Sequence, residues 1–447
     1  MGSAGPLCEC GWTHQVNQIA MPVTLNEWLA YIERVHPQSI AMGLDRVGAV
    51  RHALHLDPRI PIITVGGTNG KGSACAMLEA ILTAAGYKVG CYTSPHLLRY
   101  NERVRIGGRE VDDAQLVAAL AAVDAARDGV ELTYFEFGTL AAVWLFVRAK
   151  LDAAILEVGL GGRLDAVNVF DPDSTLVTSI ALDHMGYLGT TRESIAYEKA
   201  GIFRSGRPAV CADPDPPRPL IEHADSIGAP LWLAGRDFGY EAARMQWRYW
   251  GTFGRREGLP KPSLRGDFQV GNAAACLAVL DSVRERLPVS MHDIRTGLVQ
   301  VEIPARFQVL PGRPVVILDV AHNPQAAAAL AANLADMGRT GGRTLAVFAM
   351  LRDKDITGVA GAVKARVDQW FIAPAPGARG ADVVELARRL AAAGVTAPVT
   401  AWADIATAYA QACDRAGEND RIAVFGSFLT VAAVMQARAG PATAKQT

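Results

Sequence analysis

A glycine-rich loop between a strand and a helix is the feature that most restricts how this chain can fold. Residues 61–66 (PIITVG) form a short apolar run closed by glycine, which is typical of a buried parallel strand. The loop GTNGKGS follows at residues 67–73, and apolar side chains then recur on one helical face between residues 77 and 85. Gly86 ends this periodic run. A strand, a tight loop and a helix in this order predict an α/β unit built on a parallel sheet.

Further strand candidates alternate with helical stretches in two groups. The first group continues with apolar runs at 88–94, 152–159 and 174–180. The second group has strand candidates at 314–321, 343–350, 369–373 and 421–427, separated by alanine-rich helices such as 324–337 and 381–393. A chain of 447 residues is also too long for one compact core. We therefore expect an α/β protein with a P-loop mononucleotide-binding N-terminal domain and a smaller, Rossmann-like α/β C-terminal domain.

The domain boundaries are placed where these patterns stop. Residues 1–20 read as a flexible N-terminal tail, and residues 21–300 as the nucleotide-binding domain. Residues 301–306, which contain a proline after a helical segment, are expected to form a hinge linker to a second domain at 307–440. The run DPDPPRP at 213–219 is expected to be a loop, because proline cannot donate to a strand or helix ladder.

Composition excludes several kinds of partner and location. Lys and Arg total 44 against 45 for Asp and Glu, so the charge gives no reason to expect nucleic acid or an acidic membrane as partner. Seven cysteines without a framework spacing, among them Cys8 and Cys10 in the tail, favour reduced thiols in a reducing compartment. No run approaches the roughly 18 apolar residues of a membrane span, and the start of the chain lacks a secretory pattern. We expect a cytoplasmic protein.

The loop at 67–73 has the chemistry of a phosphate site. Its glycines let consecutive backbone N–H groups point inward, the following helix adds positive potential, and Lys71 supplies a mobile cation. The loop departs from the standard P-loop pattern, because Val65 stands where glycine is usual and Gly72 separates Lys71 from Ser73. A glycine-rich turn without a phosphate role is the alternative, and the strand–loop–helix context favours nucleotide binding. The predicted nucleotide-binding residues are Gly67, Thr68, Asn69, Gly70, Lys71, Gly72 and Ser73.

Other motifs follow in a fixed order along the chain. They are TSPHL at 93–97, LTYFEF at 132–137, LEVGLGGRLD at 156–165, SIALDH at 179–184, YEKAGI at 197–202, DVAHNP at 319–324 and GSF at 426–428. With GTNGKGS, this set resembles the family of folylpolyglutamate synthases and dihydrofolate synthases. The resemblance covers about residues 24–437, nearly the whole expected folded chain.

The resemblance implies an ATP-dependent amide ligase that also needs Mg²⁺. In this family a γ-phosphoryl group moves to a substrate carboxylate, and the amine of L-glutamate attacks the resulting acyl phosphate. The leading interpretation is a bifunctional enzyme acting on dihydropteroate and on reduced folates, with a pteroate site in the first domain, a glutamate ligase role for the second, and a monomeric state. Folylpolyglutamate synthase activity alone, a cell-wall Mur-type amino-acid ligase, a P-loop kinase or switch ATPase, and a non-catalytic binding module are the alternatives.

Four residues are candidate ligands for two Mg²⁺ ions. Glu157 ends an apolar strand, where a carboxylate is costly to bury without a cation, so metal ligation is favoured over a structural ion pair. By resemblance Ser94 and His184 are also ligands, and Lys199 becomes one when carbamylated. A loop-capping Ser94, a satisfied core His184 and a surface Lys199 with an acidic neighbour are the alternatives. Asp183 is expected to orient His184.

The remaining candidates are assigned by resemblance. Asn272, Arg306 and Asp319 are expected to hold the nucleotide, with an N-cap region as the alternative for Asp319. His322 and Ser427 are expected near the incoming glutamate. The acceptor side is assigned to Phe135, Glu136 and Asp165, and core packing is the alternative for Phe135. The residues expected to take part in catalysis are Lys71, Glu157, His184, Lys199 and His322.

The chain departs from the family pattern in two places. The residues after His184 are Met185, Gly186 and Tyr187, where relatives often carry a Thr-Asp-Trp type sequence. Gly271 precedes Asn272, where the family usually has proline. Neither departure changes a residue assigned to metal or phosphate.

Overall fold

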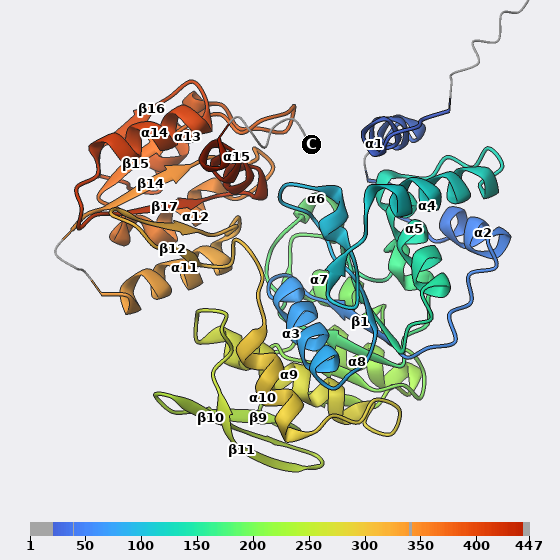
Figure 1. Ribbon diagram of the computed structural model, residues 1–447. Coiled ribbons are helices and arrows are strands. Elements are labelled where there is room, and N and C mark those ends of the chain that lie inside the picture. Colours follow the sequence, from blue (N-terminus) through green and yellow to red (C-terminus); the bar gives the residue numbers. More distant parts are fainter. Residues whose placement is uncertain (1–20, 39, 339–341, 441–447) are drawn as a thin grey trace, which may run out of the picture.

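The computed structural model describes residues 21–38, 40–338 and 342–440. It consists of two α/β domains, each built on its own sheet, with the C-terminal domain drawn in orange and red in Figure 1. The expected fold class is thereby confirmed. The predicted tail at 1–20, with Cys8 and Cys10, lies outside the described residues.

The first sheet has eight strands in the order β4-β3-β2-β5-β1-β6-β7-β8. Its parallel strands are β1 (Ile62–Gly66), β2 (Val89–Tyr92), β5 (Ala153–Glu157), β6 (Ser174–Val177), β7 (Ala209–Cys211) and β8 (Leu231–Leu233). Two antiparallel strands, β3 (Val104–Ile106) and β4 (Arg109–Glu110), close one edge. β1 pairs with both β5 and β6, and Val65 lies opposite Glu157. The end of β1 is therefore flanked by the ends of β5 and β6, as expected for a ligand site in a parallel sheet.

Alternate residues of the strands face two separate cores. One face is covered by α1 (Leu25–Val35), α2 (Asp45–Ala53), α4 (Asp113–Ala126), α5 (Tyr134–Arg148), α7 (Arg192–Ala200) and α8 (Arg218–Ile227). The opposite face is covered by α3 (Lys71–Ala84), α9 (Phe268–Ser282) and α10 (Met291–Gln300). Ile62 belongs to the first core and Ile63 to the second, because successive side chains of a strand point to opposite faces.

The second sheet has six strands in the order β12-β13-β17-β14-β15-β16. They are β12 (Gln308–Leu310), β13 (Val315–Leu318), β14 (Thr344–Phe348), β15 (Gln369–Ile372), β16 (Val399–Ala401) and β17 (Arg421–Phe425), and only β12 is antiparallel. One face carries α11 (Pro324–Asp336), α12 (Ile356–Val363) and α13 (Val383–Ala392), and the other carries α14 (Ile405–Arg415) and α15 (Phe428–Ala439). Residues 301–306, the predicted hinge, lie between α10 and β12.

The sequence interpretation did not include the strands β3, β4, β7, β8, β12 and β16, and two further features differ from it. The run at 213–219 was expected to be a loop throughout, but α8 already begins at Arg218 and Pro219 lies in its first turn. Proline is tolerated there because a first-turn N–H has no partner within the helix. The sequence interpretation also missed the small sheet of β9 (Gly239–Ala242), β10 (Gln246–Gly251) and β11 (Gly254–Pro260). Its signal is the alternation in β10, where the buried Trp247 and Tyr249 alternate with the exposed Gln246 and Arg248.

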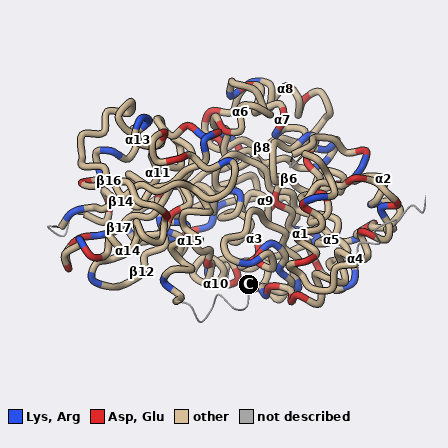
Figure 2. Tube along the Cα trace, turned by 90° about the horizontal axis from the view of Figure 1, so that it is seen from above, with Lys and Arg blue, Asp and Glu red and all other residues tan. Residues whose placement is uncertain are grey.

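Charges of both signs are interspersed along the chain (Figure 2). Across the described residues, every helix is too short or too polar to cross a membrane.

Candidate active site

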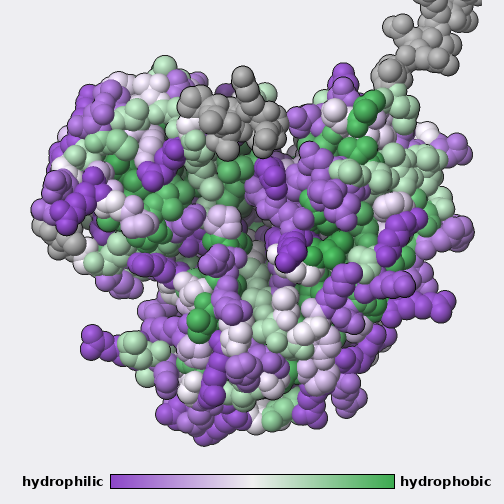
Figure 3. Space-filling view, in the orientation of Figure 1, coloured by the Kyte–Doolittle hydropathy of each residue, from purple (hydrophilic) through white to green (hydrophobic). Residues whose placement is uncertain are grey.

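A cavity of about 1120 Å³ lies between the two domains. Figure 3 shows the molecular surface hollowed between them. Every residue that the sequence interpretation assigned to the site lines this cavity, although these residues come from both domains.

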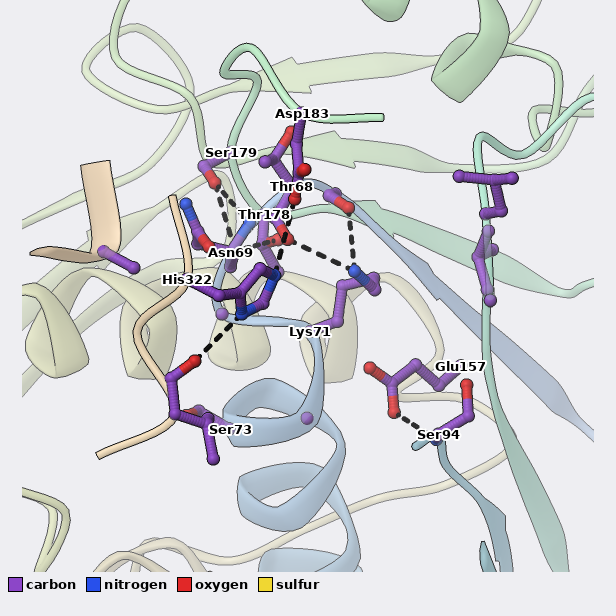
Figure 4. A pocket seen from close by; sticks show the side chains of 18 of the residues that line it. Thr68, Asn69, Lys71, Ser73, Ser94, Glu157, Thr178, Ser179, Asp183 and His322 are labelled. Carbon is purple, nitrogen blue, oxygen red and sulfur yellow. Dashed lines mark hydrogen bonds and ion pairs between the residues drawn. The ribbon is translucent and has the colours of Figure 1, made fainter. Parts of the chain in front are cut away.

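The glycine-rich loop is held by the end of β6 (Figure 4). The Thr68 backbone N–H donates to the carbonyl oxygen of Ser179 at 2.7 Å, and the Asn69 N–H donates to Ser179 Oγ at 3.0 Å. Lys71 Nζ donates to the carbonyl oxygens of Gly67 and Thr68 at 3.1 and 3.2 Å. The ammonium group thus lies over the loop, where phosphate oxygens are stronger acceptors than these neutral carbonyls. The loop geometry fits a nucleotide phosphate site.

Gly67 is required at its position by two features of the backbone. Its φ is +139°, and a Cβ there would lie 1.9 Å from Thr178 Oγ1. Gly67→Ala is therefore expected to lower the free energy of unfolding by at least about 2 kcal/mol and to weaken ADP binding severely. Thermal unfolding and calorimetric titration with ADP measure the two effects. Gly48→Ala on α2 is the matched control, because no atom lies within 4 Å of its Cβ position. An ADP affinity of Gly67→Ala within twofold of wild type would contradict the prediction.

Glu157 is buried at the end of β5, with 4% of its surface exposed. Its Oε2 accepts a hydrogen bond from the Ser94 backbone N–H at 3.0 Å. Burial raises the pKa of this carboxyl group, against the opposing effects of Lys71, the Ser94 N–H and Arg306. A buried carboxylate at the phosphate loop fits a divalent cation. Because the described residues contain no group of three His, Cys, Asp or Glu placed to hold a metal, Ser94 and ligand oxygens would have to complete its coordination.

His184 and Asp183 meet a lysine from the C-terminal domain. Lys354 Nζ lies 2.5 Å from Asp183 Oδ1 and 3.1 Å from His184 Nε2. Burial and then the charge of Lys354 lower the pKa of His184 to about 4, so the imidazole is neutral. A neutral imidazole can bind metal, but a cation on Nε2 would require Lys354 to move. The site therefore fits the first cation, at Glu157, more directly than a second one at His184. The sequence interpretation missed Lys354, which follows β14 in the segment LRDKD.

Asp183 connects the two domains. Besides Lys354, it is approached by His322 Nε2 at 3.5 Å and Asn323 Nδ2 at 3.4 Å. Burial by itself raises the pKa of Asp183, but the His322 hydrogen bond and the Lys354 charge hold it well below its usual range. Asn323 also forms a reciprocal amide pair with Asn69 of the glycine-rich loop, at 3.1 and 2.9 Å. Polar side chains of the second domain thus reach the phosphate loop and the Asp183 segment together.

Lys199 is buried, with 3% of its surface exposed, so the alternative of a surface lysine is wrong. Among the described residues, its amine has no hydrogen-bond or ion-pair partner. Burial, followed by the charge of Lys71, lowers its pKa to about 7. The group is therefore about half neutral at neutral pH, and a neutral amine is a nucleophile toward CO₂.

The candidates for the acceptor side line the same cavity, but not all of their side chains are free to bind a ligand. Phe135 is half-buried on the first turn of α5, with its ring 2.6 Å from the position a Cβ on Gly159 would take. Both oxygens of Glu136 are engaged within the protein, by Arg46 Nη2 at 3.0 Å and by the Thr133 N–H at 2.7 Å. Glu136 therefore anchors α5 and Arg46 rather than offering a free carboxylate. Burial raises the pKa of Asp165 to about 7, although backbone N–H groups donate to both of its oxygens.

The second domain contributes the remaining candidates. Asp319 accepts from the N–H groups of Phe307 at 2.9 Å and Ala321 at 2.7 Å, so it organises the turn after β13. The N-cap of α11 is Asn323, so Asp319 belongs to the turn that leads into this N-cap. Arg306 lies 5.1 Å from the ring centroid of Phe428, and burial lowers the pKa of its guanidinium.

Two further candidates form side-chain hydrogen bonds within their own helices. Ser427 caps α15 and is hydrogen-bonded to the hydroxyl of Thr430 at 2.7 Å. Asn272 is buried on α9 and donates to Gln269 Oε1 at 3.0 Å. Of the residues at which the chain departs from the family pattern, Gly271 lines the cavity, whereas Met185 and Tyr187 are exposed beside it.

Comparison with known proteins agrees with this architecture. The family model for the Mur ligase middle domain matches residues 65–280, and that for the Mur ligase glutamate ligase domain matches residues 305–428. The dihydrofolate synthase/folylpolyglutamate synthase of Escherichia coli K12 is 45% identical over 420 residues, covering 94% of this chain and 96% of the relative.

Solved structures match over a similar length. Escherichia coli FolC in complex with DHPP and ADP superposes with a TM-score of 0.87 at 45% identity, covering 92% of this chain and 97% of that one. A bifunctional folylpolyglutamate synthase/dihydrofolate synthase with Mn, AMPPNP and L-glutamate bound gives a TM-score of 0.85 at 46% identity, covering 92% and 97%. The chain therefore belongs to the dihydrofolate synthase/folylpolyglutamate synthase family of ATP-dependent ligases.

Proposed function

We propose that this protein joins L-glutamate to dihydropteroate and extends reduced folates with further glutamates, in both cases through an acyl phosphate. The observation that carries the proposal is the single cavity into which the phosphate loop, Glu157 and the Phe135–Asp165 region all open. The names of the relatives and the DHPP, ADP, AMPPNP and L-glutamate bound in the related structures support these substrates.

The N-terminal domain would bind and orient the phosphates. Lys71 and the backbone N–H groups of residues 70–73 contact the β- and γ-phosphates, and Arg306 reaches them from the hinge. Asn272 and Asp319 hold the base and ribose. Glu157 and Ser94 would hold the first Mg²⁺, and His184 with a carbamylated Lys199 would hold a second. Bound Mg²⁺ neutralises phosphate charge during transfer.

The chemistry requires activation of the acceptor carboxylate. A carboxylate cannot expel oxide when an amine attacks, whereas an acyl phosphate releases phosphate readily. An enzyme nucleophile is unnecessary, which agrees with the deep burial of Cys75, Cys91, Cys211 and Cys276. His322 and Ser427 would position the incoming glutamate, and contact between the domains would exclude water from the acyl phosphate.

The test is ADP release by the purified protein with ATP, Mg²⁺ and L-glutamate, comparing dihydropteroate and tetrahydrofolate as acceptors. Mass spectrometry of the products identifies the added glutamyl group. We expect turnover with both acceptors and none without glutamate. Turnover with tetrahydrofolate alone would reduce the function to chain extension. Absence of turnover with either acceptor would favour a cell-wall ligase. ADP release that needs neither acceptor nor glutamate would indicate a switch ATPase.

We further propose that the enzyme acts as a cytoplasmic monomer without nucleic-acid or membrane partners. The near-balanced charge and the interspersed signs in Figure 2 support the absence of nucleic-acid and acidic-membrane partners. Size-exclusion chromatography with light scattering measures the oligomeric state.

A further inference from the structure

Arg103 is a buried cation that the proposed reaction leaves without a role. Its side chain lines the cavity, and the residue is only 9% exposed. Its Nε donates to His96 Nδ1 at 2.8 Å. Within the part of the chain that the structure describes, its two terminal nitrogens have no hydrogen-bond or ion-pair partner. Neither nitrogen is among the buried side-chain atoms without a partner, so both are accessible from the cavity and open to an anionic ligand.

The surroundings hold the guanidinium in one orientation. Arg103 lies over the rings of Tyr100 and Tyr134, at 5.2 and 5.4 Å from their centroids. Because a guanidinium can only donate, His96 Nδ1 is the acceptor and the imidazole proton lies on Nε2. Burial and the charge of Arg103 lower the pKa of His96 to about 4, so this neutral tautomer persists at physiological pH. His96, which also lines the cavity, therefore provides another donor beside the guanidinium.

The position of Arg103 relates it to the acceptor rather than to the nucleotide. It follows Ser94 by one short segment of the sequence. The Ser94 N–H donates to Glu157, and the acceptor carboxylate must meet the phosphate beside this carboxyl group. Its partner Tyr134 is adjacent to Phe135, which we assign to the heterocycle of the acceptor. Arg103 thus lines the same cavity as Phe135, proposed for the pterin, and as Ser94 and Glu157, proposed for the reacting carboxylate.

We propose that Arg103, with the Nε2–H of His96, binds the α-carboxylate of the glutamate already present on a folate acceptor. This inference rests on the proposed function. A folate ends in two carboxylates, of which the γ-carboxylate reacts and the α-carboxylate is a spectator, whereas dihydropteroate ends in only one. A fixed guanidinium beside the reacting group would form charge-assisted hydrogen bonds to the spectator. Arg103 would then determine how well the enzyme extends folates without being needed for the first glutamate addition.

The experiment compares three acceptors with wild type, Arg103→Met and Arg103→Lys. The acceptors are dihydropteroate, tetrahydrofolate, and a tetrahydropteroyl-γ-aminobutyrate that keeps the γ-carboxylate but lacks the α-carboxylate. We expect Arg103→Met to raise KM for tetrahydrofolate roughly 10- to 100-fold, the range for a lost hydrogen bond between charged groups, and to change KM for dihydropteroate less than about threefold. For the wild type, KM for the γ-aminobutyrate acceptor should exceed KM for tetrahydrofolate by a similar factor. Arg103→Met should raise KM for the γ-aminobutyrate acceptor only a little further.

Control variants distinguish this role from a loss of folding or of activity with every acceptor. Arg99→Met removes an exposed arginine of the same segment, which pairs with Glu110, and should leave all three KM values unchanged. Dihydropteroate turnover reports whether Arg103→Met is folded, and Arg103→Lys supplies the comparison if the methionine variant is unstable. Equal KM increases for dihydropteroate and tetrahydrofolate would overturn the proposal in favour of the reacting carboxylate as ligand. An increase only in KM for L-glutamate would also overturn it, whereas absence of wild-type turnover with every acceptor would refute the proposed function itself.

Discussion

Glu157→Gln is expected to lower kcat by about 10³-fold, because the amide is nearly isosteric with the carboxylate but carries no charge to hold a cation at the phosphates. The Gln carbonyl oxygen can still accept the Ser94 N–H, so the loop should keep its shape. The same substitution should raise the melting temperature without nucleotide and Mg²⁺, because it removes a charge that is costly to bury. Activity and unbound stability should therefore change in opposite directions.

Steady-state kinetics over a range of Mg²⁺ concentrations and thermal unfolding of the unliganded protein measure both effects. Glu241→Gln on β9 removes an exposed carboxylate that pairs with Arg248, and should alter neither quantity. A Glu157→Gln enzyme with kcat within tenfold of wild type would show that this carboxylate does not hold the cation.

The second large effect concerns Lys199, whose carbamylation would be CO₂-dependent. Because its pKa is about 7, the amine changes from mostly protonated at pH 6 to mostly neutral at pH 8, and only the neutral form adds CO₂. Enzyme prepared without bicarbonate should therefore regain activity when bicarbonate is added, and more completely at pH 8 than at pH 6. Lys199→Met should lower kcat by about 10²- to 10³-fold and be partly rescued by acetate, which supplies the missing carboxylate.

A ¹³C NMR signal from a carbamate after incubation with labelled bicarbonate reports the modification directly. Lys261→Met, at an exposed lysine that pairs with Asp267, is the control and should keep the bicarbonate response. Absence of both the carbamate signal and the bicarbonate response would remove Lys199 from the metal site.

Sequence reasoning located the central strands and the phosphate loop because their signals are local. The apolar runs that became β1, β5 and β6 need only a few consecutive residues, and the glycines of the loop follow directly in sequence. The small sheet β9–β11 was missed because its alternation is short and polar side chains interrupt it. The first turn of α8 was missed because proline was treated as excluding a helix, although it is compatible with a helix start.

The candidate site was predictable as a set of residues but not as a set of contacts. Motifs identified Asn69, His184 and Glu136, whereas their partners Asn323, Lys354 and Arg46 lie up to 254 positions away in sequence. The first two pairings depend on how the two domains meet and the third on how α2 packs against α5, and no local pattern records either arrangement. Arg103 is a similar case, because an arginine in a sequence is normally exposed or ion-paired. Only the fold shows that Arg103 is buried, with a hydrogen bond to His96 and no ion pair among the described residues.

The described chain passes between the two sheets once, through residues 301–306, and Leu97 is the one described side chain of the first domain that packs against a hydrophobic core of the second. The distance between the phosphate loop and the groups proposed to bind glutamate is therefore set by the length of a short connection, by a few polar contacts and by Leu97. One inserted residue can shift the following chain by roughly 3.3–3.6 Å, whereas a misplacement of about 1 Å can cost 10²-fold in rate. Both domains would still fold after such an insertion. A change in linker length would therefore lower activity without preventing either domain from folding. The length of the linker is thus constrained by function, which its amino-acid composition does not reveal.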